Sequence, residues 1–177
     1  MSTIQVHDLQ FKPFITKEKI QERVAELGAA LTEEYKDKNP IFLAILNGSF
    51  IFAADLIRAC DMNVEMSFIR LSSYEGTATT GRIVTHLGLK ENLEGKDVIL
   101  VEDIIDTGAT LHHFIPTLLE SNPNSISVVS LLIKPSALKY ALQIDHVGFK
   151  IPNKFVVGYG LDYNSLGRNL PDIYQLA

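Results

Sequence analysis

The sequence has little of several features that would assign it to a protein class at once. Its single cysteine, Cys60, excludes a disulfide framework and suits a reducing, cytoplasmic compartment. The formal net charge of −5 argues against a binder of nucleic acid or of an anionic membrane, because both attract a basic face. The most apolar long window, residues 41–57, is interrupted by Asn47, Gly48 and Asp55, so it predicts a strand, a turn and a helix instead of a membrane span. The first residues lack a basic stretch followed by an apolar one, so we expect no signal peptide.

Several common functional motifs are absent as well. No GxxxxGK(S/T) loop and no Gly-x-Ser-x-Gly turn occurs, which excludes a P-loop and the nucleophile turn of α/β-hydrolases. The Gly158-Tyr159-Gly160 run lacks the third glycine of a dinucleotide-binding fingerprint. His112 and His113 are adjacent, so their side chains diverge on a helix, and we interpret them as surface or packing residues. With 46% hydrophobic and 21% charged residues, the chain is expected to form one domain over residues 1–177.

Apolar runs alternate with amphipathic patterns along the chain, which predicts an α/β fold with a mostly parallel central sheet flanked by helices. Strands are expected over residues 41–46, 64–71, 82–89, 98–101, 126–133, 146–151 and from 155 onward. Helices are expected after Thr16, over 50–59 and over 111–119. Pro116 predicts a kink or a restart in the last helix. The small polar residues of 72–81 predict either a flap that closes over a crevice or a merely mobile hairpin tip.

The most informative stretch is VILVEDIIDTGAT, residues 98–110. It combines a buried strand with three acids, Glu102, Asp103 and Asp106, and with a turn of small residues, Thr107 to Thr110. In open α/β sheets the ligand binds beyond the carboxyl ends of the strands, and small residues there leave N–H groups free for a phosphate at a helix N-terminus. A phosphate site beside three acids fits a bound polyol or metal. The alternative is an ordinary strand–helix turn in which Asp and Thr only cap the helix.

The run VEDIIDTGATL resembles the ribose-phosphate signature of the type I phosphoribosyltransferases, in the version found in hypoxanthine-guanine phosphoribosyltransferases, and the resemblance covers residues 20–170. It implies the type I fold, with a small hood formed by the N- and C-terminal segments beside the central sheet. The implied activity is Mg²⁺-dependent transfer of a phosphoribosyl group from phosphoribosyl pyrophosphate to a 6-oxopurine in purine salvage. The resemblance also implies a homodimer or homotetramer.

The resemblance assigns a role to each matching residue. Catalysis falls to Asp106 as general base and to Lys134, which would polarise the 6-oxo group of the purine. The ribose and its phosphate are assigned to Glu102, Asp103, Asp106, Thr107, Gly108, Ala109 and Thr110, and the pyrophosphate to Leu46, Asn47, Gly48 and Arg168. The purine is assigned to Lys134, Phe155, Val156 and Asp162, the metal to Glu102, Asp103 and Asp162, and the flexible loop to Ser73 and Tyr74.

Two residues depart from the family pattern, and two functions remain as alternatives. Asn47 stands where relatives commonly carry Lys or Arg, and Gly167 stands where they usually have a bulkier residue. Taken singly, Lys134 also fits an exposed strand-end lysine, and Phe155 also fits a core residue.

The alternative functions are a non-catalytic regulator on the same fold, which senses nucleotides or binds nucleic acid, and a receiver-like signalling domain, which also gathers acids and a lysine around Mg²⁺.

Overall fold

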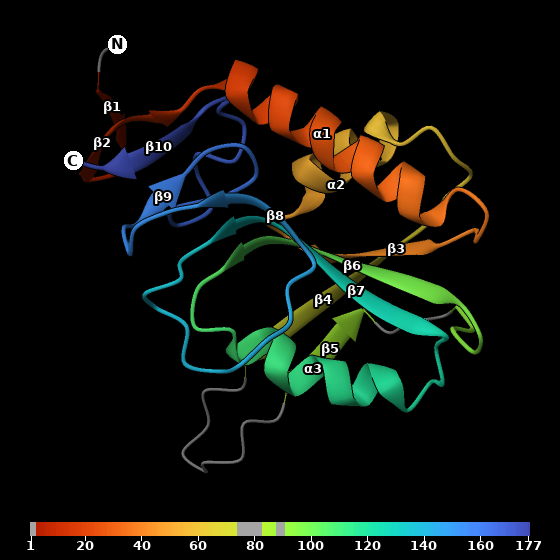
Figure 1. Ribbon diagram of the computed structural model, residues 1–177. Helices are drawn as coiled ribbons and strands as arrows, with labels where there is room; N and C mark the ends of the chain where they lie inside the picture. Colours follow the sequence, from red (N-terminus) through yellow and green to blue (C-terminus); the bar gives the residue numbers. More distant parts are fainter. Residues whose placement is uncertain (1–2, 74–82, 88–90) are drawn as a thin grey trace.

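The computed structural model describes residues 3–73, 83–87 and 91–177, which form two β-sheets and three helices (Figure 1). In chain order the elements are β1 (Ile4–Val6), β2 (Leu9–Ile15), α1 (Lys17–Tyr35), β3 (Ile41–Leu46), α2 (Phe50–Ala59), β4 (Glu65–Ser73), β5 (Ile83–Leu87), β6 (Asp97–Ile105), α3 (Ala109–Leu119), β7 (Ser125–Ile133), β8 (His146–Lys150), β9 (Val156–Val157) and β10 (Ile173–Leu176). Among these described residues, none of the helices has the length and apolarity that a membrane span requires.

The larger sheet has the strand order β5-β4-β3-β6-β7-β8. The five strands from β4 to β8 in that order are parallel, and only the edge strand β5 is antiparallel to its neighbour β4. This arrangement confirms the mostly parallel central sheet. The strands β3 and β6 lie in the middle of the sheet, where a parallel strand is covered on both faces, and their continuous apolar sequence follows from that position.

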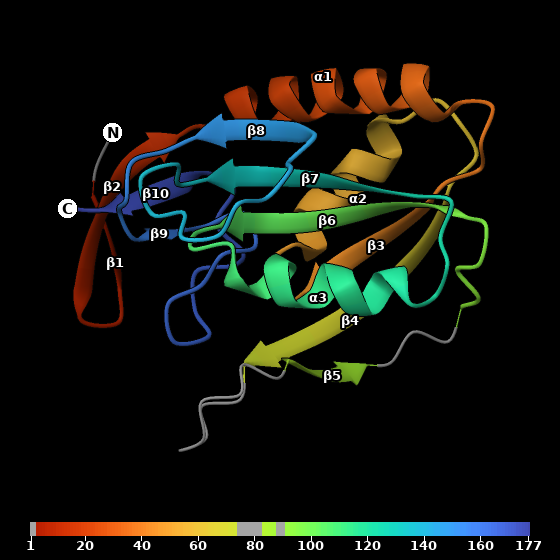
Figure 2. The ribbon, with the colours of Figure 1, turned by 60° about the horizontal axis from the view of Figure 1, so that its bottom comes forward.

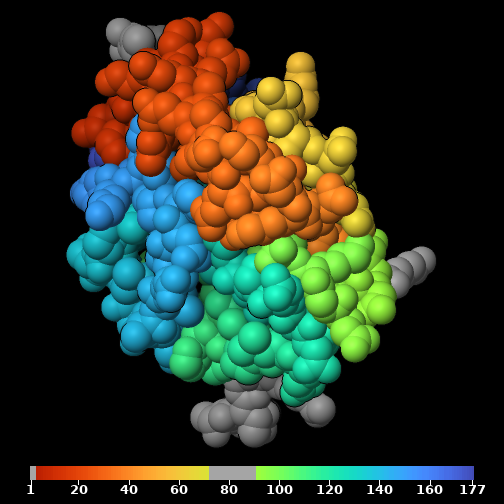
Figure 3. Space-filling view, turned by 45° about the vertical axis from the view of Figure 1, so that its right-hand side comes forward, coloured from red at the N-terminus to blue at the C-terminus, as the bar shows by residue number. Residues whose placement is uncertain are grey.

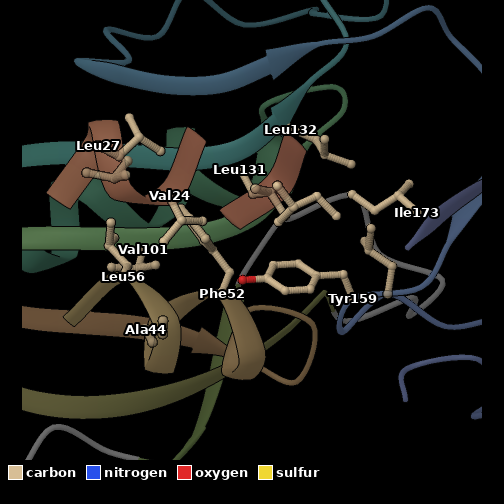
Figure 4. Close-up of a cluster of buried hydrophobic side chains, with 14 of the residues drawn as sticks. Val24, Leu27, Ala44, Phe52, Leu56, Val101, Leu131, Leu132, Tyr159 and Ile173 are labelled. Atoms are coloured by element: carbon tan, nitrogen blue, oxygen red, sulfur yellow. The ribbon is translucent and has the colours of Figure 1, made fainter. Parts of the chain in front are cut away.

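Helices cover both faces of the larger sheet (Figures 1 and 2). On one face α1 and α2 pack against alternate residues of the central strands, and Figure 4 shows Val24 of α1 and Leu56 of α2 beside Ala44 and Val101. On the other face α3 packs against the intervening residues, such as Leu43. Successive side chains of a strand point to opposite faces, so each central strand contributes to two separate cores.

The smaller sheet, which we call the hood, has the strand order β1-β2-β10-β9 and is antiparallel. Both ends of the chain therefore meet in one sheet, as the family resemblance implied. In Figure 2 the arrowheads of β6, β7 and β8 point toward the hood. The hood thus stands at the carboxyl ends of the parallel strands, where ligands bind in open α/β sheets.

The sequence patterns do not predict β1, β2 or β10, and the reason is visible in β2. Phe11 and Ile15 are buried, but Phe14 between them is partly exposed, so apolar residues do not alternate cleanly. The predicted restart of the helix at Pro116 is wrong, because α3 continues through this residue. The strands β4 and β5 pair antiparallel, as the arms of a hairpin do, and the expected flap between them, with Tyr74, lies outside the described residues.

Arg23 contributes long-range hydrogen bonds that join the first helix to β8, an edge strand of the larger sheet. The Arg23 guanidinium of α1 donates to the carbonyl oxygens of Val147 and Gly148 in β8, at 2.7 and 3.1 Å. In Figure 3 the orange atoms of α1 accordingly lie against the blue atoms of the β8 region. These charge-assisted bonds satisfy carbonyls of an edge strand, which has no neighbouring strand on this side among the described residues.

Candidate active site

Two acids, Glu102 and Asp103, follow the buried part of β6, and we call them the acid pair. Asp103 Oδ1 accepts a hydrogen bond from the Ile104 N–H at 2.9 Å. Glu102 Oε2 is buried and has no hydrogen-bond partner among the described residues. Burial raises the pKa of Glu102 well above its usual range, and the neighbouring Asp103 charge raises it further. Burial also raises the pKa of Asp103, to about 6, against the lowering effect of the Ile104 N–H. Keeping two carboxylates in this environment costs desolvation free energy. Hydrogen bonds from the hydroxyl groups of a ligand, or a cation that the ligand brings, would offset that cost.

The donor set near the acid pair fits a magnesium ion that arrives with phosphate. Within residues 3–73, 83–87 and 91–177, no group of three or more His, Cys, Asp or Glu is arranged to hold a metal. Mg²⁺ usually takes one or two carboxylates and completes its shell with water and substrate phosphates, which the acid pair allows. The oxygens of Asp162, the third predicted ligand, already accept bonds: Oδ1 from Arg168 and Oδ2 from the Ser165 N–H, both at 2.7 Å.

The residues that follow the acid pair form a hollow at the start of α3. We call residues 106–110 the phosphate loop. They line a hollow of about 90 Å³ together with Glu102, Ile104, Ile105 and Leu111. That space exceeds the roughly 10–15 Å³ that one water needs. Gly108, with a φ of +81°, caps α3, and Thr107 Oγ1 accepts the Ala109 N–H at 3.3 Å. The first N–H groups of a helix have no intrahelical partner, so the hollow offers donors to an anion.

The two residues predicted to act in catalysis contact each other. The Lys134 ammonium lies 2.7 Å from Asp106 Oδ2. The Lys134 side chain is 8% exposed and the Asp106 side chain 48% exposed, so the lysine is buried and presents its charge to an accessible carboxylate. The alternative of an exposed strand-end lysine is therefore wrong. The pairing follows from register: Ile105 of β6 pairs with Ile133 of β7, so Asp106 and Lys134 are the next residues of two neighbouring strands.

The predicted pyrophosphate residues meet the acid pair from the other side. We call residues 46–48 the pyrophosphate loop, and its Leu46–Asn47 peptide bond is cis. A Cβ on Gly48 would lie 1.5 Å from Asp103 Oδ2, so only glycine lets this loop approach the acid so closely. Arg168 pairs with Asp162 and donates to the Gly160 carbonyl at 2.7 Å. Gly160 in turn lies against this loop, because a Cβ on it would be 2.2 Å from the Gly48 carbonyl oxygen.

The departure at Gly167 has a structural reason, and the one at Asn47 concerns an exposed side chain. Gly167 has a φ of +99°, a conformation that a bulkier residue adopts only with strain. Asn47 is exposed, so its side chain takes no part in the packing that holds Gly48 against Asp103. The loop's own contribution to an anion is thus restricted to neutral polar groups.

Two of the predicted purine residues, Phe155 and Val156, lie at the start of β9 on the hood. Phe155 is 42% exposed, so the alternative of a core residue is wrong. Its ring lies 5.8 Å from Tyr163, edge to face. The Leu176 N–H of β10 donates to the Phe155 carbonyl at 2.9 Å, which makes Val156 and Gln175 a pair that does not exchange hydrogen bonds. The N–H and C=O of Val156 therefore point to the open edge of β9, where a planar heterocycle can bind them.

Sequence reasoning missed the residues that support Phe155. The Tyr163 hydroxyl donates to Asp8 Oδ1 at 2.8 Å, and the Phe11 ring lies 6.1 Å from Phe155. Asp8 and Phe11 come from the first hairpin and Tyr163 from the far end of the chain, so no local pattern connects them. The position of Tyr163 directly after the predicted Asp162 was the one available signal.

Comparisons with known proteins identify the family of this chain. Residues 15–164 match the family model of the phosphoribosyl transferase domain. The hypoxanthine-guanine phosphoribosyltransferase of Bacillus subtilis is 44% identical over 94% of this chain and 93% of its own, and that of Dictyostelium discoideum is 42% identical over 91% and 92%. A hypoxanthine phosphoribosyltransferase structure from Staphylococcus aureus has a TM-score of 0.89 and 42% identity, and the match covers 94% of this chain and 91% of that one. The chain therefore belongs to the phosphoribosyl transferase family, among the hypoxanthine-guanine phosphoribosyltransferases.

Proposed function

We propose that the protein transfers a phosphoribosyl group from phosphoribosyl pyrophosphate to a 6-oxopurine, hypoxanthine or guanine, in purine salvage. The observation that carries this proposal is the buried Glu102 carboxylate oxygen without a partner, next to a hollow lined by the start of a helix. A ribose 5-phosphate supplies the complementary groups, because its hydroxyls donate to carboxylates and its phosphate accepts from helix N–H groups. The B. subtilis and D. discoideum relatives, named for this activity, support the proposal.

In this proposal the donor lies across the carboxyl ends of β3 and β6. The acid pair accepts the ribose hydroxyls, the phosphate loop binds the 5-phosphate, and the pyrophosphate loop with Arg168 binds the leaving group. Mg²⁺, carried by the pyrophosphate and the ribose hydroxyls, would neutralise the charge that develops on the leaving group. The close packing of Gly48 against Asp103 keeps the two halves of the donor site in one corner.

The base would enter between the hood and the crevice. Phe155 stacks on its ring, and the free N–H and C=O of Val156 bind its edge. Asp162, in the same corner as Arg168, would contact the base from the pyrophosphate side. Asp106 accepts the proton from the purine N7 as the new bond forms, and Lys134 donates to the 6-oxo oxygen. The ion pair of Asp106 and Lys134 holds both side chains ready, and the incoming base then replaces it with contacts of its own.

Lys134 also accounts for base selection. An ammonium is a donor only, so it matches the acceptor oxygen of a 6-oxopurine and mismatches the 6-amino group of adenine. A polar site that is left unpaired rejects the wrong substrate strongly, by more than a missing apolar contact would.

A base panel tests the proposed function. The protein is incubated with phosphoribosyl pyrophosphate, Mg²⁺ and hypoxanthine, guanine, xanthine or adenine in turn, and nucleotide and pyrophosphate are quantified. We expect product with hypoxanthine or guanine and none with adenine. Comparable use of adenine would disprove the role of Lys134. No product with any base would overturn the enzyme assignment, and a mobility shift with nucleic acid or labelling by a phosphodonor would then support the regulator or the receiver instead.

We also infer that the protein forms a homodimer or homotetramer and works in the cytoplasm. The single cysteine supports the reducing compartment. Among the described residues, exposed apolar side chains such as Phe50 and Phe68 are available to form an interface between two copies. Light scattering of the purified protein measures the mass, and a monomer at micromolar concentration would contradict the inference.

A further inference from the structure

The chain between β7 and β8 contains neither helix nor strand, yet it packs against the phosphate loop. It begins at Lys134, whose N–H donates to the Ile105 carbonyl at 3.0 Å. In Figure 1 it runs from the end of β7 past the first turn of α3 before it returns to β8. Long connections without secondary structure are uncommon in compact domains, and ordered ones usually have a function.

The middle of this connection binds the carbonyl oxygen of Thr107. The N–H groups of Lys139 and Tyr140 donate to it at 3.0 and 3.4 Å. This carbonyl shares a planar peptide unit with the N–H of Gly108, a residue that lines the hollow. Two donors on the carbonyl fix the plane of that unit and polarise it, so the Gly108 N–H becomes a better placed and stronger donor.

Side chains of the same connection hold the loop from two further directions. A Cβ on Gly108 would lie 2.7 Å from Leu142 Cδ1, so Leu142 packs directly on the backbone of the phosphate loop. The Tyr140 ring stacks on His112, with centroids 4.4 Å apart and planes 25° from parallel. His112 stands in the first turns of α3, and its N–H donates to the Gly108 carbonyl at 3.0 Å. His113 meets the same Tyr140 ring edge to face at 5.7 Å.

We propose that Tyr140 is a positioning residue for the 5-phosphate of the donor and of the product nucleotide. It acts through two routes: its N–H holds the Thr107 carbonyl, and its ring, stacked on His112, holds the first turns of α3. Neither the Tyr140 side chain nor the His112 side chain lines the hollow, so both act on the ligand through the phosphate loop. The proposal rests on the proposed function, because the loop needs this support only if it binds a phosphate.

A purely structural role for Tyr140 makes different predictions. Loss of packing alone would lower the melting temperature and weaken all ligands of the crevice alike. Loss of positioning would weaken ligands that carry a 5-phosphate and leave those bound at the pyrophosphate loop unchanged. Ribose 5-phosphate and inorganic pyrophosphate with Mg²⁺ separate the two roles, since each occupies one end of the donor site.

The experiment measures both ligands by calorimetry on the wild-type protein and on four variants. These are Tyr140→Ala, Tyr140→Phe, His112→Ala and the control Leu119→Ala, which alters an exposed residue of the same helix. We expect Tyr140→Ala and His112→Ala each to weaken ribose 5-phosphate by about three- to tenfold, the range of an aromatic pair, with pyrophosphate affinity unchanged. Tyr140→Phe keeps the ring and should bind as the wild type does, and so should Leu119→Ala.

The double variant sharpens the result. Because Tyr140 and His112 act as one stacked pair, the double variant His112→Ala/Tyr140→Ala should bind ribose 5-phosphate about as weakly as either single variant. Unchanged ribose 5-phosphate affinity in both single variants, or an equal loss for both ligands, would overturn the proposal. His112 is exposed, so His112→Ala keeps the test valid if Tyr140→Ala fails to fold. A wild-type protein that binds neither ligand would instead overturn the proposed function.

Discussion

The two halves of the candidate site are built in different ways. The half proposed to bind the donor lies at the carboxyl ends of β3, β6 and β7, strands whose side chains are mostly buried. The half proposed to stack on the base and bind its edge lies on the hood, where strands from both ends of the chain pair and where Phe155 is 42% exposed. The donor half is fixed by the core, whereas the base half is fixed by contacts between distant segments.

The difference predicts how each half responds to change. In the donor half, the acids are partly buried, with one Glu102 oxygen fully so, and Gly48 touches the Asp103 carboxylate, so little can move without affecting the site. In the base half, an exposed ring is supported by other rings, so a substitution should change the affinity for the base and leave the donor site intact. The following variants test that division, from the largest expected effect to the smallest.

Asp106→Asn should have the largest effect, because it removes the proposed general base from the donor half. We expect kcat to fall by roughly 10²- to 10⁴-fold, the usual contribution of a positioned base. The KM for the donor should change little, since asparagine keeps the shape of the side chain. Steady-state kinetics and a melting curve check the prediction, and near-normal turnover by a folded variant would show that another group takes the proton.

Phe155→Ala should produce the largest effect in the base half. Loss of stacking is expected to raise the KM for hypoxanthine roughly 5- to 100-fold, with the KM for phosphoribosyl pyrophosphate unchanged. Phe155→Tyr serves as the matched control, because it keeps an aromatic face. If both KM values rose together, the two halves would not be independent, and the division drawn above would fail.

Asp103→Asn should change the pH dependence of the donor half. The pKa of Asp103 is raised from 3.8 to about 6, so the folded protein holds a proton that the unfolded chain releases in that window. The stability of the ligand-free protein therefore falls as pH rises from 3.8 to about 6, and donor affinity, which needs the carboxylate, rises over the same range. The variant should flatten the stability curve there and weaken donor binding. Melting temperatures between pH 4 and 7 measure the change in stability. Glu102, whose pKa is also raised, is present in both proteins and contributes equally to both curves. If the variant showed the same slope of melting temperature against pH as the wild type, the raised pKa of Asp103 would be contradicted.

Tyr163→Phe should have the smallest effect. It removes the hydroxyl that donates to Asp8 and keeps the ring beside Phe155. Because this bond is at the surface, we expect a change of no more than about twofold in the KM for the base. Tyr163→Ala, which removes the ring as well, should raise that KM further, and equal values for the two variants would show that the ring does not support Phe155.

The same division marks what the sequence could predict. Buried parallel strands are recognisable in the sequence as apolar runs. Because ligands bind at the carboxyl ends of such strands, the sequence also predicts where the acid pair, the phosphate loop and Lys134 lie. The pairing of Lys134 with Asp106 needed the register of β6 and β7, which apolar runs do not reveal. The hood depends on backbone shapes without a clear sequence signal, and positive φ values occur at Gly158, Tyr159, Gly160, Asn164, Ser165 and Gly167.

The role of the segment around Tyr140 could not be predicted from the sequence for a related reason. It has no periodic pattern, and its importance comes from two amide donors and one ring that meet the phosphate loop. Amide donors belong to every residue except proline, so composition carries no trace of them.

The open edge of β9 has a consequence for how base preference can evolve. Val156 presents its own N–H and C=O there, and every residue except proline presents the same two atoms. A substitution at this position by any residue except proline therefore keeps the main-chain N–H and C=O that the proposed heterocycle would contact. If Val156 binds the base as proposed, we expect a change of base preference to require substitutions at side chains such as Lys134, while this strand edge keeps its main-chain groups.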